Sequence, residues 1–396
     1  MSALLRSERF SAIALLIAAV LGLILANSAV ASGLEQVLGF HTPWGAVGLD
    51  LSISHWISDG LLAVFFFLVA IELKHELVVG QLSNAKTAVI PAIAAVGGVL
   101  VPAGIYLLFT HGTGFAHGWP IPTATDIAFA LGILAIFGRG LPSNVRVFLL
   151  ALAVLDDLIA IVIIAIVFAH DTDFLALGGA IVALAVFFAL ARRLRTGRAR
   201  EHRNQTVLIL ALVVVGILVW WLVLQSGVHA TIAGVALGLV LPRKPGHLAY
   251  DRIEPWSNAI VLPVFAFAAA AVMIPSVGLR ELSPTFFGIV IALPVGKVIG
   301  ITIFGGIASR LGRHPSRPTL SLGSVATVGV LGGIGFTVSL LMNELAFARN
   351  EEIVDEGTLA VLVGSGVAMV ASAVCVALHA RYHRRIAEHR EADLPA

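Results

Sequence analysis

Long apolar runs separated by short polar segments extend along almost the whole chain. A membrane-spanning helix needs about 20 predominantly apolar residues, and runs of roughly that length recur twelve times, the eighth being shorter than the others. The pattern predicts an all-α integral membrane protein, with residues 1–396 forming a single polytopic domain of about twelve transmembrane helices. The runs cover residues 10–31, 58–80, 88–109, 119–138, 145–168, 174–191, 205–224, 228–242, 257–275, 285–309, 323–346 and 357–380.

The basic residues are sorted between the two sides that this pattern defines. Arg280 and Arg349 fall on one side and Lys297 lies inside a run, whereas every other Lys and Arg falls on the side of the N-terminus. Cytoplasmic loops carry an excess of Lys and Arg, so we expect both chain ends to be cytoplasmic. The first run, which follows Arg6 and Arg9, lacks a clear cleavage context and is predicted to be a membrane helix rather than a removable signal.

The composition supports a membrane protein and excludes several other classes. Hydrophobic residues make up 59% of the chain and charged residues 12%, against about 25% charged residues in soluble domains; the mean hydropathy is +0.99. A net charge of +2 does not indicate nucleic-acid binding. The single cysteine, Cys375, permits no intrachain disulfide or Cys-based metal cluster. The chain contains no GxxxxGK[ST] motif for ATP, and we expect no cofactor.

Two adjacent carboxylates, Asp156 and Asp157, interrupt the fifth apolar run. An acid at bilayer depth costs about 2.5 to 3.5 kcal/mol on insertion scales, unless a proton, a cation or an opposite charge offsets it. Lys297 lies at the midpoint of the tenth run, about 18 Å from either end at 1.5 Å per residue, which is too deep for snorkelling. Neighbours on a helix diverge by about 100°, so we expect one aspartate to bind an ion and the other to pair with Lys297.

Two other runs contain signals that interrupt a helix. The first eight residues of the fourth run, from Trp119 to Asp126, are Trp-Pro-Ile-Pro-Thr-Ala-Thr-Asp. The two prolines forbid a continuous helix there. We expect the helix to restart at Thr123, with Thr123 and Asp126 as a capping box. The eleventh run has glycines at 329, 332, 333 and 335, which would unwind a helix or allow close helix packing.

An interrupted run in each half of a chain points to a transporter with inverted repeats and a binding site at mid-membrane. We expect the repeats to cover residues 88–168 and 285–380. Na⁺ and Li⁺ are hard cations that favour oxygen ligands, which Thr125, Asp126, Asp156 and Asp157 could supply. Burial and mutual repulsion raise carboxyl pKa values, so protons and the cation would compete for the same oxygens, and discharge of two protons per cation would make the exchange electrogenic.

Further polar residues lie near the ends of the predicted helices. Glu72 and Glu76 share one helical face and could be a solvated helix end or a negative mouth that gathers cations. Asp59 lies at the other end of that run, where it could be merely interfacial. His229 lies at the start of the eighth run and could be a helix cap or a proton sensor. Residues 49–54 alternate with period two, so they form either a short hairpin or an irregular loop.

The chain closely resembles the bacterial NhaA Na⁺/H⁺ antiporter family from about residue 10 to residue 380. The resemblance implies twelve helices, with the fourth and eleventh unwound and crossing at mid-membrane, in a homodimer of the inner membrane. It also implies that Asp157 is the principal Na⁺ or Li⁺ ligand, that Asp156 pairs with Lys297, and that Asp126 and Lys297 face the ends of the broken helices. The similarity rests on residues 65–74 (FFFLVAIELK), 123–132 (TATDIAFALG), 153–157 (AVLDD), 226–231 (SGVHAT) and 332–337 (GGIGFT).

The same resemblance associates Glu72, Glu76, His229 and Gly335 with ion access or pH response, and hence with pH homeostasis and salt tolerance. The chain departs from the family pattern at Tyr250, where an acidic residue is frequent, and within residues 268–271, where alanines replace an asparagine. We therefore expect a rearranged pH response. Two membrane aspartates also define intramembrane aspartyl proteases, but those place the acids on separate helices; a passive channel is a third interpretation, which would lack obligatory counter-flow.

Overall fold

Helices follow one another along the chain in the computed structural model, which describes residues 8–45, 48–168, 172–194, 202–274, 282–311 and 321–392. The first half contains α1 (Glu8–Ala26), α2 (Ala31–Leu38), α3 (Ile53–His55), η3 (Trp56–Leu61), α4 (Leu62–Val78), η4 (Gln81–Ser83), α5 (Ala85–Phe109), η5 (Ala116–Gly118), η6 (Ile121–Thr123), α6 (Ile127–Phe137), α7 (Ser143–Val167) and α8 (Phe174–Ala191). The second half contains α9 (His202–Gln225), α10 (Thr231–Val240), α11 (Arg243–Trp256), η7 (Ser257–Val261), α12 (Leu262–Ala269), α13 (Pro284–Ile291), η8 (Ala292–Gly296), α14 (Lys297–Leu311), α15 (Leu322–Gly332), α16 (Phe336–Phe347) and α17 (Glu351–Ala392).

The helical elements confirm a multi-pass all-α membrane protein. Within the described ranges, nine helices are long and apolar enough to cross a membrane, and α15 with α16 makes a tenth if the bent pair counts as one span. The eighth predicted run corresponds to α10, which is apolar but has only 10 residues. The ninth predicted run corresponds to η7 and α12, which continue from the polar helix α11 without a break. This segment is not among the nine helices counted above.

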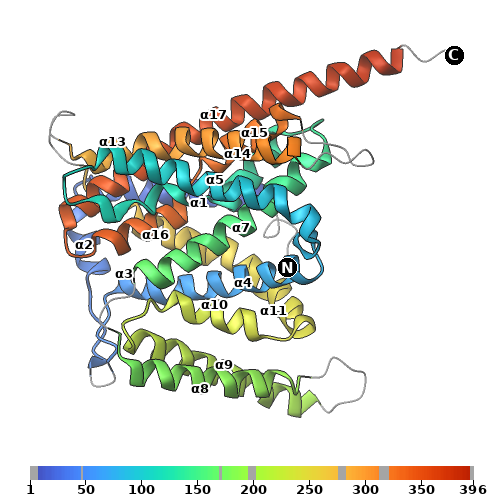
Figure 1. The fold of residues 1–396 in the computed structure, drawn as a ribbon. Helices are drawn as coiled ribbons and strands as arrows, with labels where there is room; N and C mark the ends of the chain where they lie inside the picture. Colours follow the sequence, from blue (N-terminus) through green and yellow to red (C-terminus); the bar gives the residue numbers. More distant parts are fainter. Residues whose placement is uncertain are drawn as a thin grey trace.

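The long helices lie roughly parallel and form successive layers (Figure 1). The hairpin of α8 and α9 forms one edge and packs on α10, which in turn lies against α4. Helix α7 contacts α4 on one side and α5 on the other. Helices α13, α14, α15 and α17 lie on the same side of α7 as α5. The fifth apolar run therefore becomes a central helix, which explains why its two aspartates are withdrawn from lipid.

The connection between α2 and α3 is a short paired segment, as one of the two sequence interpretations predicted. Antiparallel bridges join His41 to Ser52 and Trp44 to Leu49, although no strand forms in the described part of the segment and residues 46 and 47 lie outside it. Trp56 anchors the segment by donating from Nε1 to Thr42 Oγ1 at 3.1 Å. The basic residues Arg195, Arg198 and Arg200 fall outside the residues that the structure describes.

Glycines bring α5 and α14 unusually close together. A Cβ on Gly300 would lie 2.1 Å from the Gly97 carbonyl oxygen, and a Cβ on Gly296 would lie 2.7 Å from Pro102 Cα. Such distances are far below van der Waals contact, so both glycines are required by the backbone approach. This approach fixes α14, and with it Lys297 at the first position of that helix.

We expect Gly300→Ala to destabilise the protein, because the added methyl group must push α5 and α14 apart. Overpacking of this kind costs about 1–3 kcal/mol, which outweighs the gain of roughly 1 kcal/mol from replacing a helical glycine. The melting temperature of the purified protein in detergent should fall by several degrees. Gly104→Ala is the matched control, because no atom lies within 4 Å of its added Cβ; equal melting temperatures for the two variants would contradict the close approach.

Candidate functional site

A buried ion pair joins the two membrane-embedded charges that the sequence singled out. Lys297 Nζ lies 2.6 Å from Asp156 Oδ2, and the exposed fractions of the two side chains are 0% and 2%. The π-helical turn η8 directly precedes Lys297 and contains Pro294, which has no backbone N–H to donate. The predicted pairing of Lys297 with one of the adjacent aspartates is confirmed.

Asp157 lies beside this pair without a comparable partner. Its side chain is 8% exposed, and in the ranges that the structure describes no donor forms a hydrogen bond with its carboxylate. It interacts electrostatically with Asp156, Glu72, Asp126 and Lys297, so three of its four charged neighbours are acids. Because an isolated buried carboxylate is strongly disfavoured, Asp157 requires a species from outside the protein.

The fourth predicted run is broken as its prolines require, but the helix restarts later than expected. Residues 121–123 form the short turn η6, Ala124 and Asp126 have extended backbones, and α6 begins at Ile127. The prediction that helix restarts at Thr123 is wrong: its hydroxyl donates to the Pro120 carbonyl at 2.6 Å. Asp126 is itself the N-cap, accepting at Oδ1 from the amides of Ala128 and Phe129.

The eleventh run is also interrupted, between α15 and α16, where the chain bends by 49°. The sequence offered two interpretations of the glycines in this run, an unwound helix and close helix packing, and both apply. A Cβ on Gly335 would lie 2.2 Å from Ser339 Oγ and 2.6 Å from Leu293 Cδ1, and one on Gly332 would lie 2.7 Å from Ile301 Cδ1. Gly335 therefore permits a dense contact at the start of α16.

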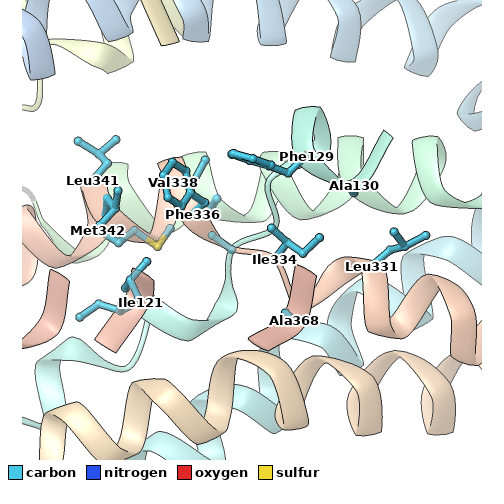
Figure 2. Packing of buried hydrophobic residues seen from close by; sticks show 14 of the residues in the cluster. Ile121, Phe129, Ala130, Leu331, Ile334, Phe336, Val338, Leu341, Met342 and Ala368 are labelled. Carbon is cyan, nitrogen blue, oxygen red and sulfur yellow. The ribbon is translucent and has the colours of Figure 1, made fainter. Parts of the chain in front are cut away.

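The two breaks contact each other through backbone and side chains. The Asp126 amide donates to the Ile334 carbonyl at 2.5 Å, and the Thr125 hydroxyl donates to the Gly332 carbonyl at 2.9 Å. Figure 2 shows this region, where Phe129 and Phe336 come from the two broken segments; their rings pack edge to face at 5.0 Å. Carbonyls that the helices leave unpaired are thus satisfied across the contact.

The Asp126 carboxylate caps two helices at once. Besides its bonds to α6, Oδ2 accepts from the Thr337 amide at 3.2 Å and from the Thr337 hydroxyl at 2.7 Å, at the start of α16. A carboxylate is stabilised at a helix N-terminus by the unpaired amides and the helix dipole. The sequence argument treated Asp126 as a cap of its own helix, but the role of Thr337 could not be inferred without the tertiary contact.

A pocket of about 160 Å³ lies at the end of α4, between that helix and α11. Glu72, Glu76, His75, His247 and Tyr250 are among its lining residues. Tyr250 donates from its hydroxyl to Glu72 at 3.3 Å. Burial, reinforced by the neighbouring carboxylates, raises the pKa of Tyr250 well above its usual value, so it remains a neutral donor. Tyr250, at which the sequence departs from the family pattern, thus contacts Glu72.

Asp59 and His229 come together at the opposite end of α4 from this pocket. His229 Nδ1 lies 4.0 Å from Asp59 Oδ1. The alternative that His229 caps a helix is wrong, because Ala230 is the N-cap of α10 and no side chain caps it. The sequence analysis missed Glu344 of α16, whose side chain bonds to Ser58 and interacts electrostatically with Asp59. Its position as an acidic residue inside the eleventh apolar run could have identified it as a candidate site residue.

The family model described as "Na+/H+ antiporter 1" matches residues 2–376 of this chain. The chain is 56% identical over 386 residues to Na(+)/H(+) antiporter NhaA 2 of Clavibacter michiganensis, covering 97% of this chain and 94% of that protein. It is 48% identical to NhaA of Tropheryma whipplei, covering 91% of each chain, and 43% identical to NhaA 3 of Streptomyces coelicolor, covering 98% and 82%. The chain belongs to the NhaA Na⁺/H⁺ antiporter family.

NhaA membership identifies the chain as a transporter and not an enzyme. The interpretation of its aspartates as an intramembrane protease site is therefore rejected, in agreement with their position on one helix. The expectation of a family relationship from about residue 10 to residue 380 is confirmed by the match over nearly the same range.

We expect Asp156→Asn in this NhaA protein to lower the melting temperature more than the double variant Asp156→Asn/Lys297→Met does. The single change leaves an ammonium group buried without its partner, and breaking a buried pair from one side costs about 3–5 kcal/mol. Removing the charge as well relieves that penalty. Thermal unfolding of the purified variants in detergent measures the difference, and a double variant no more stable than Asp156→Asn would contradict the pairing.

Proposed function

We propose that this protein exports Na⁺ or Li⁺ in exchange for protons across the bacterial inner membrane, and that both ions compete for Asp156 and Asp157. The observation that carries the proposal is Asp157, a buried carboxylate without a protein donor beside an already neutralised Asp156–Lys297 pair. A carboxylate in this position must hold either a proton or a cation. Alternation between the two is the chemistry of an antiporter.

Asp157 is the principal ligand in this proposal, because Asp156 is engaged by Lys297. Thr125 can add an oxygen, since its hydroxyl donates to Gly332 and keeps its lone pairs. Asp126 accepts four hydrogen bonds, so we infer that it holds the crossing and contributes negative charge. Across the described residues no three His, Cys, Asp or Glu side chains converge as metal ligands; carbonyl and water oxygens would complete the Na⁺ shell.

Competition at this site would make the exchange electrogenic. When Na⁺ binds, Asp157 must release its proton, and a second proton leaves the coupled Asp156–Lys297 pair as the local charge changes. Two protons then move against one cation, so net charge crosses the membrane and the potential drives the cycle. The site needs no ATP or cofactor for this step.

We further infer that the described helices form twelve spans with both chain ends cytoplasmic: the nine long helices, the bent pair, α10, and η7 with α12. The inverted repeats would be residues 88–168 and 285–380. Each contains a long helix, an interrupted span and another long helix: α5, η6 with α6, and α7 in one, and α13 with α14, α15 with α16, and α17 in the other. The breaks meet, and a crossing at mid-membrane would let one repeat move against the other around the site.

Ion access in this scheme uses the acids at the two ends of α4. Glu72 lines the cytoplasmic pocket and also interacts electrostatically with Asp157, so with Glu76 it would guide cations from the pocket towards the site. Asp59 and His229 would lie on the outward path. His229, Gly335 and the Glu72–Tyr250 contact would contribute to pH regulation, and the family resemblance favours a homodimer.

We expect Na⁺ and Li⁺, but not K⁺, to dissipate a proton gradient in everted membrane vesicles that contain the protein. Asp157→Asn should abolish the response, because an amide can neither release a proton nor neutralise a cation. Asp173→Asn is the matched control: this exposed aspartate caps α8 through a carboxylate oxygen that an amide can replace. A pH-sensitive dye measures the gradient, and full activity of Asp157→Asn would remove the site proposal.

We expect an inside-negative potential to accelerate Na⁺ efflux from proteoliposomes, because more positive charge enters with the protons than leaves with Na⁺. A potassium diffusion potential set with valinomycin supplies the driving force, and ²²Na⁺ efflux is the measurement. Liposomes without the protein control for leakage. Efflux that is equally fast with and without the potential would show an electroneutral exchange.

A further inference from the structure

Two histidines face each other on α17, away from the transport site. His379 and His383 lie one helical turn apart, their side chains are half-buried, and their Nε2 atoms are 3.1 Å apart. The ring centroids are separated by 4.8 Å with an angle of 47° between the planes. At this distance one nitrogen must carry a hydrogen and the other a lone pair.

The hydrogen-bond network around Thr327 of α15 determines which nitrogen carries the lone pair. The Thr327 hydroxyl donates its one hydrogen to the Gly323 carbonyl at 2.8 Å. It also lies 2.8 Å from His379 Nδ1. With its hydrogen on the Gly323 carbonyl, the hydroxyl accepts there and His379 donates from Nδ1. This assignment follows from the network, and it leaves the His379 Nε2 lone pair directed towards His383.

The spacing of the two Nε2 atoms suits a transition-metal ion. Metal–imidazole bonds are about 2.0–2.1 Å long, so two such ligands at 90–109° around one ion lie about 2.9–3.4 Å apart. The observed separation of 3.1 Å falls within this interval. We propose that His379 and His383 bind a divalent transition-metal ion such as Zn²⁺ or Ni²⁺ through their Nε2 atoms. The hydrogen of His383 then lies on Nδ1, so that both imidazoles bind the ion as neutral ligands.

The surroundings support the proposal. Thr327 orients His379 through its other ring nitrogen, as outer-shell partners of metal-bound histidines do. Gly323 does not crowd the site, since a Cβ added there would lie at an ordinary contact distance of 3.8 Å from His379 Nε2. No third His, Cys, Asp or Glu joins the pair within the described ranges, so water would complete the coordination. Arg381 lies two positions from each histidine and therefore on the opposite helical face.

A bound ion would act on α15 as well as on α17. His379 already ties α17 to α15 through Thr327, and Ser372 of α17 donates to the Val330 carbonyl of α15 at 3.0 Å. Helix α15 ends at Gly332, whose carbonyl accepts from Thr125 at the crossing. An ion that immobilises His379 would therefore restrain a helix that reaches the transport site, and we expect it to slow exchange.

Calorimetric titration of the detergent-solubilised full-length protein with ZnCl₂ and with NiCl₂ tests the site. The protein must carry an affinity tag without histidines. We expect one saturable site of micromolar affinity in the unmodified protein, and at least tenfold weaker binding in both His379→Gln and His383→Gln. His111→Gln is the matched control because this exposed histidine follows α5, far along the chain, and its binding should be unchanged.

Two results would overturn the proposal: no saturable binding to the unmodified protein, or unchanged affinity in both His379→Gln and His383→Gln. Melting temperatures of the variants check that each is folded, and His383→Gln leaves the His379–Thr327 contact intact. Inhibition of Na⁺-dependent proton movement by Zn²⁺, absent in His383→Gln, is the functional counterpart. That arm rests on the proposed exchange, whereas the calorimetry does not, so failure of one is distinguishable from failure of the other.

Discussion

Burial of charge away from water is the constraint on which this structure depends. Lys297 and Asp156 have almost no exposed surface, and neither could remain ionised at that depth without the other. Their contact requires α14 to lie close to α7, and α5 packs against both of these helices. The glycine-mediated approach of α5 and α14 makes this geometry possible. Asp157, next in sequence but turned by about 100°, is left as the carboxylate whose charge the protein does not balance.

The broken helices solve a second problem of the same kind. Backbone that leaves a helix in the membrane interior exposes unpaired amides and carbonyls, which is tolerated only where protein or a cavity satisfies them. Here each break serves the other: Asp126 accepts from the starts of both α6 and α16, while Gly332 and Ile334 accept from Thr125 and Asp126. The contact between the two breaks is thus held by polar interactions as well as by the apolar packing of Phe129 against Phe336.

These features connect the site to both ends of the bundle. Glu72 belongs to the pocket beside α11 and is also within electrostatic range of Asp157. At the other end of α4, Asp59 lies beside His229 and interacts with Glu344. Away from α4, Thr327 and His379 join α15 to α17. Of these residues, Thr327 and Glu344 belong to α15 and α16, the two helices that flank the second break.

The sequence by itself determined the fold class, the family, the two interrupted segments and the identity of the central charges. These follow from local rules: run length, proline and glycine chemistry, and the free energy of a charge in hydrocarbon. It misplaced the restart of α6 at Thr123, allowed His229 to be a cap and missed Glu344, because those assignments depend on which partner is within reach. The family resemblance implied the pairing of Asp156 with Lys297. Only the tertiary structure decided that Asp126 caps two helices and that Thr327 holds His379. The physical reason is that hydrogen bonds and ion pairs act over about 3 Å, and residues 52 to 211 positions apart reach that distance only after the helices have packed.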